Sequence, residues 1–179
     1  MSADDEERDG SPLFAGPNSD PGKKQLRATM RRTISGIVPV NFDYSLSTRD
    51  NYLDPEAPHV GRYSSIRASL DEAYHGQYCR ARQVLQDELI SDVNRRIKGG
   101  QASPWIIFTA GAMGAGKSHV FSWMAERGVV PMQEVQIIDP DVFKAALPEW
   151  PGYLEREPLE AGFHTRKESG YLTEIAFEV

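Results

Sequence analysis

Apolar residues recur every three or four positions in two stretches of the chain. The first covers about residues 64–98, with charged residues between the apolar ones and Gly99-Gly100 as a stop. This spacing predicts one long helix that covers or flanks a sheet. The second covers residues 159–179 and also predicts a helix. Its expected inner face combines an apolar stripe with two polar residues: His164, Glu168, Tyr171, Leu172 and Ile175.

Two short runs rich in β-branched and aromatic residues predict strands. They are residues 105–110 and 134–138, and a helical pattern that starts at His119 lies between them. Arg127-Gly128 is expected to end this helix. A strand, a helix and a second strand form a βαβ unit, whose right-handed crossover makes the strands parallel. The predicted fold class is therefore α/β, with a parallel sheet flanked by helices.

A complete G-x-x-x-x-G-K-[ST] motif follows the first predicted strand. Glycines in such a loop let consecutive backbone N–H groups wrap a phosphate chain, because no β-carbon obstructs the approach. Lys117 opens the next helix and can reach the β- and γ-phosphates, and Ser118 offers a hydroxyl to Mg²⁺. A glycine-rich turn without a ligand would explain the glycines but not the Lys-Ser pair. The predicted nucleotide site comprises Gly111, Ala112, Met113, Gly114, Ala115, Gly116, Lys117, Ser118 and His119.

Two carboxylates, Asp139 and Asp141, follow the second predicted strand. Ligands bind at the carboxyl ends of parallel strands, so both are expected at the same sheet edge as the phosphate loop. There a carboxylate either joins the Mg²⁺ shell or accepts a proton from a substrate hydroxyl. The structural alternatives are that Asp139 ends the strand and that Asp141 is the N-cap of a helix over residues 142–146.

Composition and proline content divide the rest of the chain. The 179 residues carry a formal net charge of −6, so nucleic acid is not an expected partner. No apolar run is long enough to span a bilayer or act as a secretion signal, which predicts no membrane association and a cytoplasmic location. Cys79 is the single cysteine, which excludes an intrachain disulfide. The expected organisation is a low-order leader over residues 1–60, a helical segment over 61–100 and a domain with the phosphate loop over 101–179.

Together these motifs resemble the zeta toxin family of P-loop kinases. The resemblance rests on GAMGAGKS, on IIDPDVFKAALPEW and on FHTRKESGYLTEIAFE, and it covers about residues 104–179. It implies a kinase fold and transfer of a phosphoryl group from ATP or GTP, with Mg²⁺, to a hydroxyl of a small molecule. Bacterial members of the family phosphorylate a UDP-linked amino sugar. By this resemblance Lys117 would bind the transferring phosphate, Ser118 would hold Mg²⁺ and Asp141 would be the base.

The resemblance also places the last predicted helix beside the substrate, which makes His164 and Glu168 candidate substrate contacts. The alternative is a histidine–carboxylate pair at the rim of the core, since the two positions lie one helical turn apart. The family's third strand and later arginines would lie beyond Val179. The chain is therefore expected to be the N-terminal half of such a domain, truncated after two strands, which bury too little surface alone. We expect it to bind nucleotide weakly and not to turn over by itself.

Two other classes of function fit the same motifs. A nucleotide-binding NTPase or regulatory module would use ATP to set a conformation without phosphorylating an acceptor. A pseudo-enzyme would use the domain only as an interaction surface. Neither composition nor spacing indicates the acceptor, a protein partner or a preference between ATP and GTP.

Overall fold

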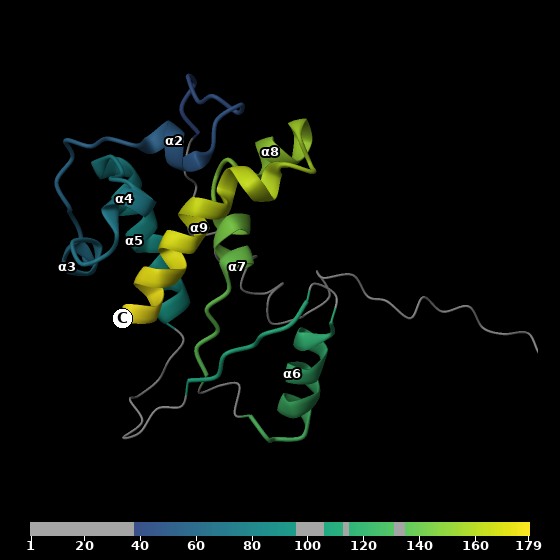
Figure 1. The fold of residues 1–179 in the computed structure, drawn as a ribbon. Helices are drawn as coiled ribbons and strands as arrows, with labels where there is room; N and C mark the ends of the chain where they lie inside the picture. Colours follow the sequence, from purple (N-terminus) through teal and green to yellow (C-terminus); the bar gives the residue numbers. More distant parts are fainter. Residues whose placement is uncertain (1–37, 96–105, 113–114, 131–134) are drawn as a thin grey trace, which may run out of the picture.

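The computed structural model describes residues 38–95, 106–112, 115–130 and 135–179. Figure 1 shows two regions, a helical body formed by α2–α5 and α7–α9, and a phosphate-loop arm formed by residues 106–112 and 115–130. The helices are α2 (Thr48–Tyr52), α3 (Ser64–Arg67), α4 (Glu72–His75), α5 (Arg80–Asn94), α6 (Lys117–Glu126), α7 (Pro140–Ala146), α8 (Trp150–Arg156) and α9 (Ala161–Glu178).

Helix α9 lies at the centre of the helical body. α7 packs along it most extensively, and α2, α5 and α8 also contact it (Figure 1). All five residues of the predicted inner face are buried, so the helix expected over residues 159–179 is confirmed. Burying one large aliphatic or aromatic side chain contributes about 1.5–3 kcal/mol to the free energy of unfolding. The core contains side chains with almost no exposed surface: Leu89, Ile90, Val142, Phe143, Leu172 and Ile175.

The single long helix expected over residues 64–98 is wrong, because the structure has three shorter helices there, α3, α4 and α5. Asp71 caps α4 by accepting a hydrogen bond from the Tyr74 N–H, which starts a new helix. Gly76 ends α4 with a φ of 74°, a conformation that glycine adopts at little cost. α3 and α5 both turn apolar residues toward the same core, so the helical spacing continues on either side of the breaks, whereas Tyr74 of α4 is 49% exposed.

Residues 38–60 also differ from the expected low-order leader, since they contain α2 and pack on the C-terminal helices. Tyr153 Oη donates to the Leu46 carbonyl at 2.6 Å, and Tyr52 Oη donates to Glu149 Oε1 at 2.5 Å. The prolines of this segment lie before and after α2 rather than inside it, so they do not interrupt the helix. Residues 1–37 lie outside the described residues. The division at residues 60 and 100 stays a prediction.

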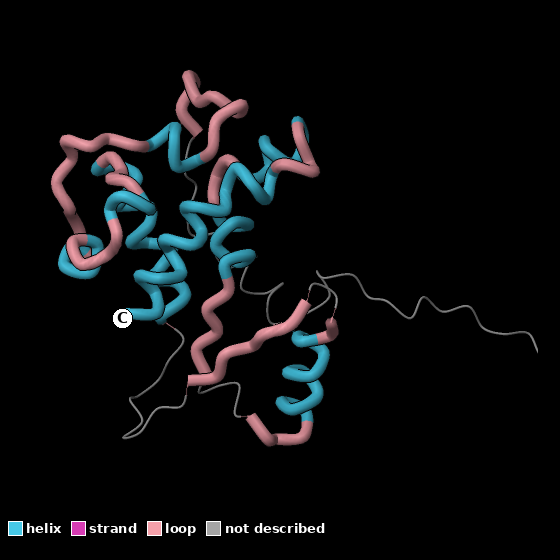
Figure 2. Tube along the Cα trace, in the orientation of Figure 1, coloured by secondary structure: helices cyan, strands magenta, loops and turns pink. Residues whose placement is uncertain are grey.

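The predicted parallel sheet is not confirmed. Within the described ranges the structure contains no strand, and residues 106–110 and 135–138 run as extended chain without a hydrogen-bonded ladder (Figure 2). Extended chain becomes a strand only through hydrogen bonds to a neighbour, and a lone pair of parallel strands is weakly stable. The apolar side chains of the first segment therefore stay exposed: Ile106 by 63%, Ile107 by 50% and Phe108 by 78%.

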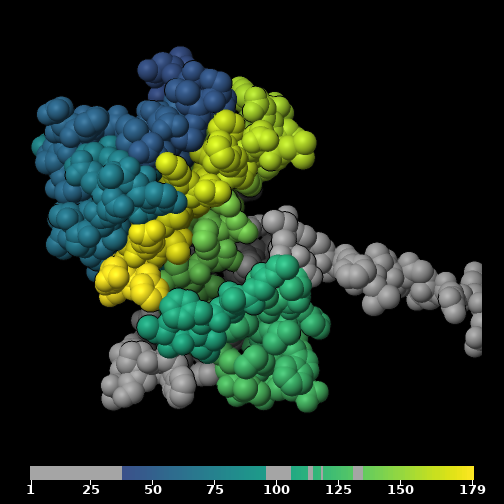
Figure 3. Space-filling view, in the orientation of Figure 1, coloured from purple at the N-terminus to yellow at the C-terminus, as the bar shows by residue number. Residues whose placement is uncertain are grey.

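The helix of the phosphate-loop arm is confirmed where it was expected. α6 begins at Lys117, directly after the loop, and ends beside the predicted stop at Arg127-Gly128. Figure 3 shows the arm, in green, as a lobe beside the helical body, and Val120 and Trp123 of α6 keep about half of their surface exposed. None of the helices in the described part of the chain is long and apolar enough to cross a membrane.

Candidate phosphoryl-transfer site

The phosphate loop turns sharply into α6. Gly116 has a φ of 76°, which a residue with a β-carbon adopts only at a cost, and its carbonyl accepts the Val120 N–H at 3.0 Å. The Ala115 N–H donates to the Ala112 carbonyl at 3.2 Å and closes the turn before it. The first N–H groups of α6 have no intrahelical acceptor and point toward the loop. This geometry favours an anion at the loop.

Lys117 folds back over the loop that precedes it. Its Nζ donates to the Gly111 carbonyl at 2.5 Å and to the Ala112 carbonyl at 2.9 Å. The ammonium therefore lies among the backbone groups that the sequence motif assigns to phosphate binding. The other predicted nucleotide-binding residues are Ser118 and His119, in the first turn of α6, and Met113 and Gly114, which lie outside the described residues.

The two predicted carboxylates mark the start of α7. Asp139, not Asp141, is the N-cap: its Oδ1 accepts the Asp141 N–H at 2.9 Å, and Pro140 takes the first helical position. The alternative role of Asp141 as N-cap is therefore wrong. The Asp141 carboxylate is 65% exposed and lies 3.1 Å from Lys144 Nζ. The Asp141 carboxylate is thus accessible at this end of the helix.

The predicted site residues fall into two groups in space. In Figure 1 the start of α7, with Asp139 and Asp141, is at the end of the helical body nearest the phosphate-loop arm. The N-terminal half of α9, with His164 and Glu168, lies toward α2 and α8 instead. The loop and Asp141 therefore lie on one side of the molecule, and the two candidate substrate contacts lie deeper in the body.

Glu168 is held by a buried group of side chains, which we call the Arg82 network: Arg82, Gln86, Glu149, Glu168 and Tyr52. Glu168 Oε1 accepts hydrogen bonds from Arg82 Nε at 2.6 Å and from Gln86 Nε2 at 2.9 Å, and Oε2 accepts one from Arg82 Nη2 at 2.8 Å. Arg82 also donates to both oxygens of Glu149, at 2.9 and 3.0 Å. The Tyr52 ring lies over the guanidinium, with 4.0 Å between the Arg82 Cζ and the ring centroid.

The Arg82 network buries one positive and two negative charges. Arg82, Glu149 and Glu168 are 3%, 1% and 0% exposed. Burial alone would raise the pKa of Glu168, but the charge of Arg82 and the hydrogen bonds from Arg82 and Gln86 hold that pKa below its usual value. Both oxygens of Glu168 are engaged by α5. A direct contact between Glu168 and a substrate would therefore require α5 to move away from α9.

His164 is almost buried and does not pair with Glu168. Its ring stacks on the Tyr153 ring, with centroids 4.9 Å apart and an interplanar angle of 9°. Its Nε2 lies 3.4 Å from Glu157 Oε2, and its Nδ1 has no hydrogen-bond partner among the residues that the structure describes. The expected alternative of a His164–Glu168 pair is therefore wrong. A role for His164 in substrate binding stays a prediction.

Two members of the network, Arg82 and Glu149, are not among the predicted site residues. For Arg82 a weak signal was present, because it stands at helical spacing between Tyr78 and Leu89, although Gln86 makes the same line partly polar. A charge in that line has to be paired by another element. Glu149 gave no such signal because it lies just before α8, between two short helices, where periodicity carries little information.

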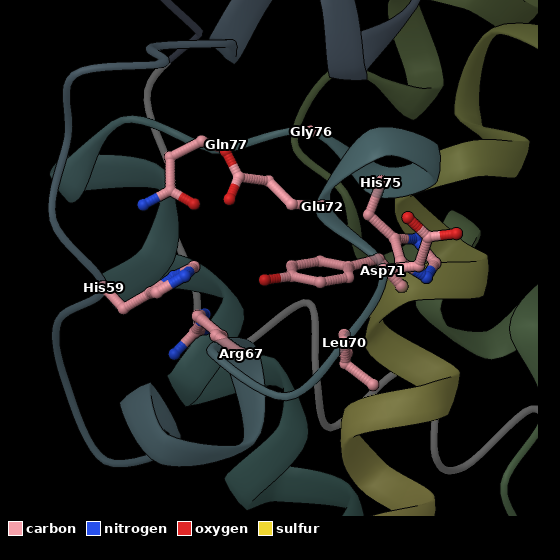
Figure 4. A pocket seen from close by; sticks show the side chains of 9 residues that line it. His59, Arg67, Leu70, Asp71, Glu72, His75, Gly76 and Gln77 are labelled. Atoms are coloured by element: carbon pink, nitrogen blue, oxygen red, sulfur yellow. The ribbon is translucent and has the colours of Figure 1, made fainter.

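Two cavities of the helical body are too small for a nucleotide. The pocket in Figure 4 is too narrow for a water molecule and is lined by His59, Arg67, Leu70, Asp71, Glu72, His75, Gly76, Gln77 and Tyr171. The second measures about 110 Å³ and is lined by Ser47, Arg49, Asp50, Phe163, Arg166 and Lys167. Ligand pockets usually have about 300 Å³ or more. The open loop of the arm, rather than either cavity, remains the candidate nucleotide site.

Comparison with known proteins gives one match. A family model described as Zeta toxin matches residues 88–179, which is just over half of the chain. No curated protein and no solved structure matches significantly. The family match begins inside α5 and includes the arm and α7–α9. Residues 38–87 precede it, yet they supply Tyr52, Arg82 and Gln86 to the Arg82 network.

The matched region contains the phosphate loop, Asp139 and Asp141, and the whole of α9. A domain of this family indicates an ATP-binding, kinase-like function, and the family generally uses ATP and Mg²⁺. The extent of the match and the loop geometry agree with the family's P-loop kinase fold. The chain therefore belongs to the zeta toxin family.

Proposed function

We propose that the chain binds ATP, or GTP, through residues 111–119 and transfers the γ-phosphoryl group to a hydroxyl of a small molecule. The observation that carries this proposal is the loop conformation: Gly116 turns the chain directly into α6, and Lys117 lies over the loop carbonyls. A tight loop, an ammonium and an open helix N-terminus together fit a triphosphate. Family membership supports the nucleotide and the kinase-like reaction.

In the nucleotide-binding step, Lys117 would exchange the carbonyls of Gly111 and Ala112 for phosphate oxygens. Ser118 and Asp139 would hold Mg²⁺, which neutralises charge on the phosphates when it is bound. The described residues contain no group of three or more His, Cys, Asp or Glu side chains that could hold a metal ion. Mg²⁺ takes few protein ligands and shares phosphate oxygens, so the nucleotide would supply the rest of its coordination shell.

In the transfer step, Asp141 would accept the proton of the acceptor hydroxyl. The hydroxyl oxygen forms a bond to the γ-phosphorus as its O–H bond breaks, and the bond from the γ-phosphorus to the bridging oxygen breaks, so that an electron pair leaves on the diphosphate. The exposure of the Asp141 carboxylate supports this role. We propose a sugar nucleotide as the acceptor, on the family resemblance. His164 and Glu168 would contact it, and Glu168 would do so only after α5 moves away from α9.

A second candidate is a nucleotide-controlled regulatory module without an acceptor. It is favoured by the weak attachment of α6 to the other helices and by the exposure of Val120 and Trp123. Nucleotide binding at the loop could then change how the arm packs, with no transfer. The two candidates share the loop but differ in the role of Asp141.

Nucleotide binding is tested by calorimetric titration of the whole chain with MgATP. Lys117→Ala removes a charged hydrogen-bond donor to the phosphates, so we expect at least about tenfold weaker binding. Lys167→Ala, on the exposed side of α9, is the matched control and should bind as the wild type does. Equal affinities for Lys117→Ala and the wild type would contradict the proposed site.

Because this chain is not expected to turn over repeatedly by itself, transfer is tested under single-turnover conditions, which detect a slow reaction, with ATP radiolabelled at the γ-phosphate and a mixture of sugar nucleotides. We expect Asp141→Asn to keep its ATP affinity and to lower the transfer rate by about a hundredfold or more. Transfer at the wild-type rate by Asp141→Asn would show that the assigned base is wrong. Labelled inorganic phosphate without a labelled acceptor would favour the regulatory module.

A further inference from the structure

We propose that Lys144 is a positioning residue for Asp141. The inference rests on the proposed function, because it concerns the carboxylate that would accept the acceptor's proton. Lys144 Nζ donates a hydrogen bond to Asp141 Oδ1 at 3.1 Å. The pair links the last turn of α7 to its first turn.

The Lys144 side chain is held along the helical body. Its neighbours in α7 are buried, namely Val142, Phe143, Ala145 and Ala146. Lys144 itself is only 19% exposed, whereas the Asp141 carboxylate is 65% exposed. The aliphatic stem is therefore covered, and the ammonium reaches back toward the surface at Asp141. A lysine held in this way loses less conformational freedom on pairing than a fully solvated lysine does.

Both the backbone and the side chain of Asp141 are held by neighbouring residues. Asp139 Oδ1 accepts the Asp141 N–H at 2.9 Å, and Pro140 restricts the backbone between them. Lys144 engages Oδ1 of the Asp141 carboxylate, and Oδ2 carries no hydrogen bond to any described residue. One oxygen is thus engaged by Lys144, while the Asp141 side chain as a whole is 65% exposed. A general base must come within about 2.6–3.2 Å of the hydroxyl that it deprotonates, so fixing its rotation favours transfer.

The same pair could be an ordinary ion pair on a helix surface, which contributes little to stability. The two explanations differ in a measurable way. An ion pair that serves only the fold leaves the transfer rate of the folded protein unchanged. A positioning residue changes that rate, and it does so only while Asp141 is present to be positioned.

The experiment is a double-mutant cycle on single-turnover transfer in the whole chain. We expect Lys144→Met to slow transfer by about ten- to a hundredfold, with unchanged affinity for MgATP, because a misplaced catalytic group costs about that much. Lys144→Arg keeps a cation and should restore the rate to within about threefold of the wild type. Asp141→Asn and Asp141→Asn/Lys144→Met should have the same rate. Lys167→Met is the control lysine variant and should transfer normally.

No decrease with Lys144→Met, or an equal decrease in the wild-type and Asp141→Asn backgrounds, overturns the positioning role. A failure of Asp141→Asn to slow transfer overturns the proposed function instead, so the two failures are distinguishable. The urea midpoint of Lys144→Met shows whether the variant is folded. Partial unfolding caused by Lys144→Met would lower the transfer rate by the same factor in the wild-type and Asp141→Asn proteins. The cycle therefore still separates positioning from stability.

Discussion

The helical body and the phosphate-loop arm differ in how completely they bury their side chains. In the body, Leu172 and Ile175 are fully buried, and the internal charge of Arg82 is paired on two sides. In the arm, Phe108 and Trp123 are 78% and 46% exposed. Buried apolar contacts and paired internal charges set the free energy of local opening. We therefore expect the body to provide the stability and the arm to open most easily.

The residues proposed for the chemistry and the residues that hold the fold together lie in different parts of the molecule. The phosphate loop lies in the arm, and Asp141 lies at the end of the body nearest to it. Ligand-binding loops are often drawn from the less stable parts of a protein, because they must change conformation when the ligand binds. The Arg82 network, in contrast, joins residues before and after the start of the family match. Residues 38–87 are thus part of the folded body.

The largest effect is expected from Arg82→Met. This change leaves Glu149 and Glu168 buried without a cation, and breaking a buried pair from one side costs about 3–5 kcal/mol of unfolding free energy. Urea denaturation followed by far-UV circular dichroism measures the loss. Arg80→Met, at an exposed position of the same helix, should cost less than about 0.5 kcal/mol. If Arg82→Met lowered the unfolding free energy as little as Arg80→Met does, the Arg82 network would not stabilise the body.

A matched pair of truncations compares the two regions directly. Leu172→Ala removes a fully buried side chain and should lower the unfolding free energy by about 2–5 kcal/mol. Val120→Ala removes one that is 52% exposed in α6, and we expect a loss below about 1 kcal/mol. Thermal or urea unfolding of both variants provides the measurement. Equal losses would show that the apolar face of α6 is as well covered as the core of the body.

The smallest of the three effects is a pH dependence. The folded-state pKa of Glu168 lies below its usual value of 4.5, because Arg82 outweighs the effect of burial. The stabilisation from this carboxylate is therefore present above about pH 4.5 and is lost as the pH falls through the folded-state pKa. We expect the unfolding free energy of the wild type to fall more steeply with acidification below that pH than that of Glu168→Gln. Glu178→Gln, at an exposed position of the same helix, should keep the wild-type slope. Identical slopes for all three proteins would contradict the assigned pairing.

Much of the local structure could be predicted because it depends on near neighbours in the sequence. The position of α6 follows from the glycines before it and from the stop at Arg127-Gly128, and α9 follows from its periodic apolar face. Asp141 was expected at the start of α7, although the cap is Asp139. The breaks around α4 were missed because apolar spacing continues across them, while Asp71 and Gly76 interrupt the backbone. The predicted strands require a hydrogen-bonding neighbour that spacing alone does not supply.

The sequence by itself determined the phosphate loop, the helix that follows it and the family to which the chain belongs, because these depend on residue types at short, fixed spacing. Only the tertiary structure decided that Arg82 lies between Glu149 and Glu168, and how far the Lys144 side chain is covered beside Asp141. The Arg82 contacts join residues far apart in the chain, whereas the Lys144–Asp141 pair lies within α7 and depends on the body only for the burial of the Lys144 side chain. The Arg82 contacts exist only once α5, α9 and the start of α8 are packed together.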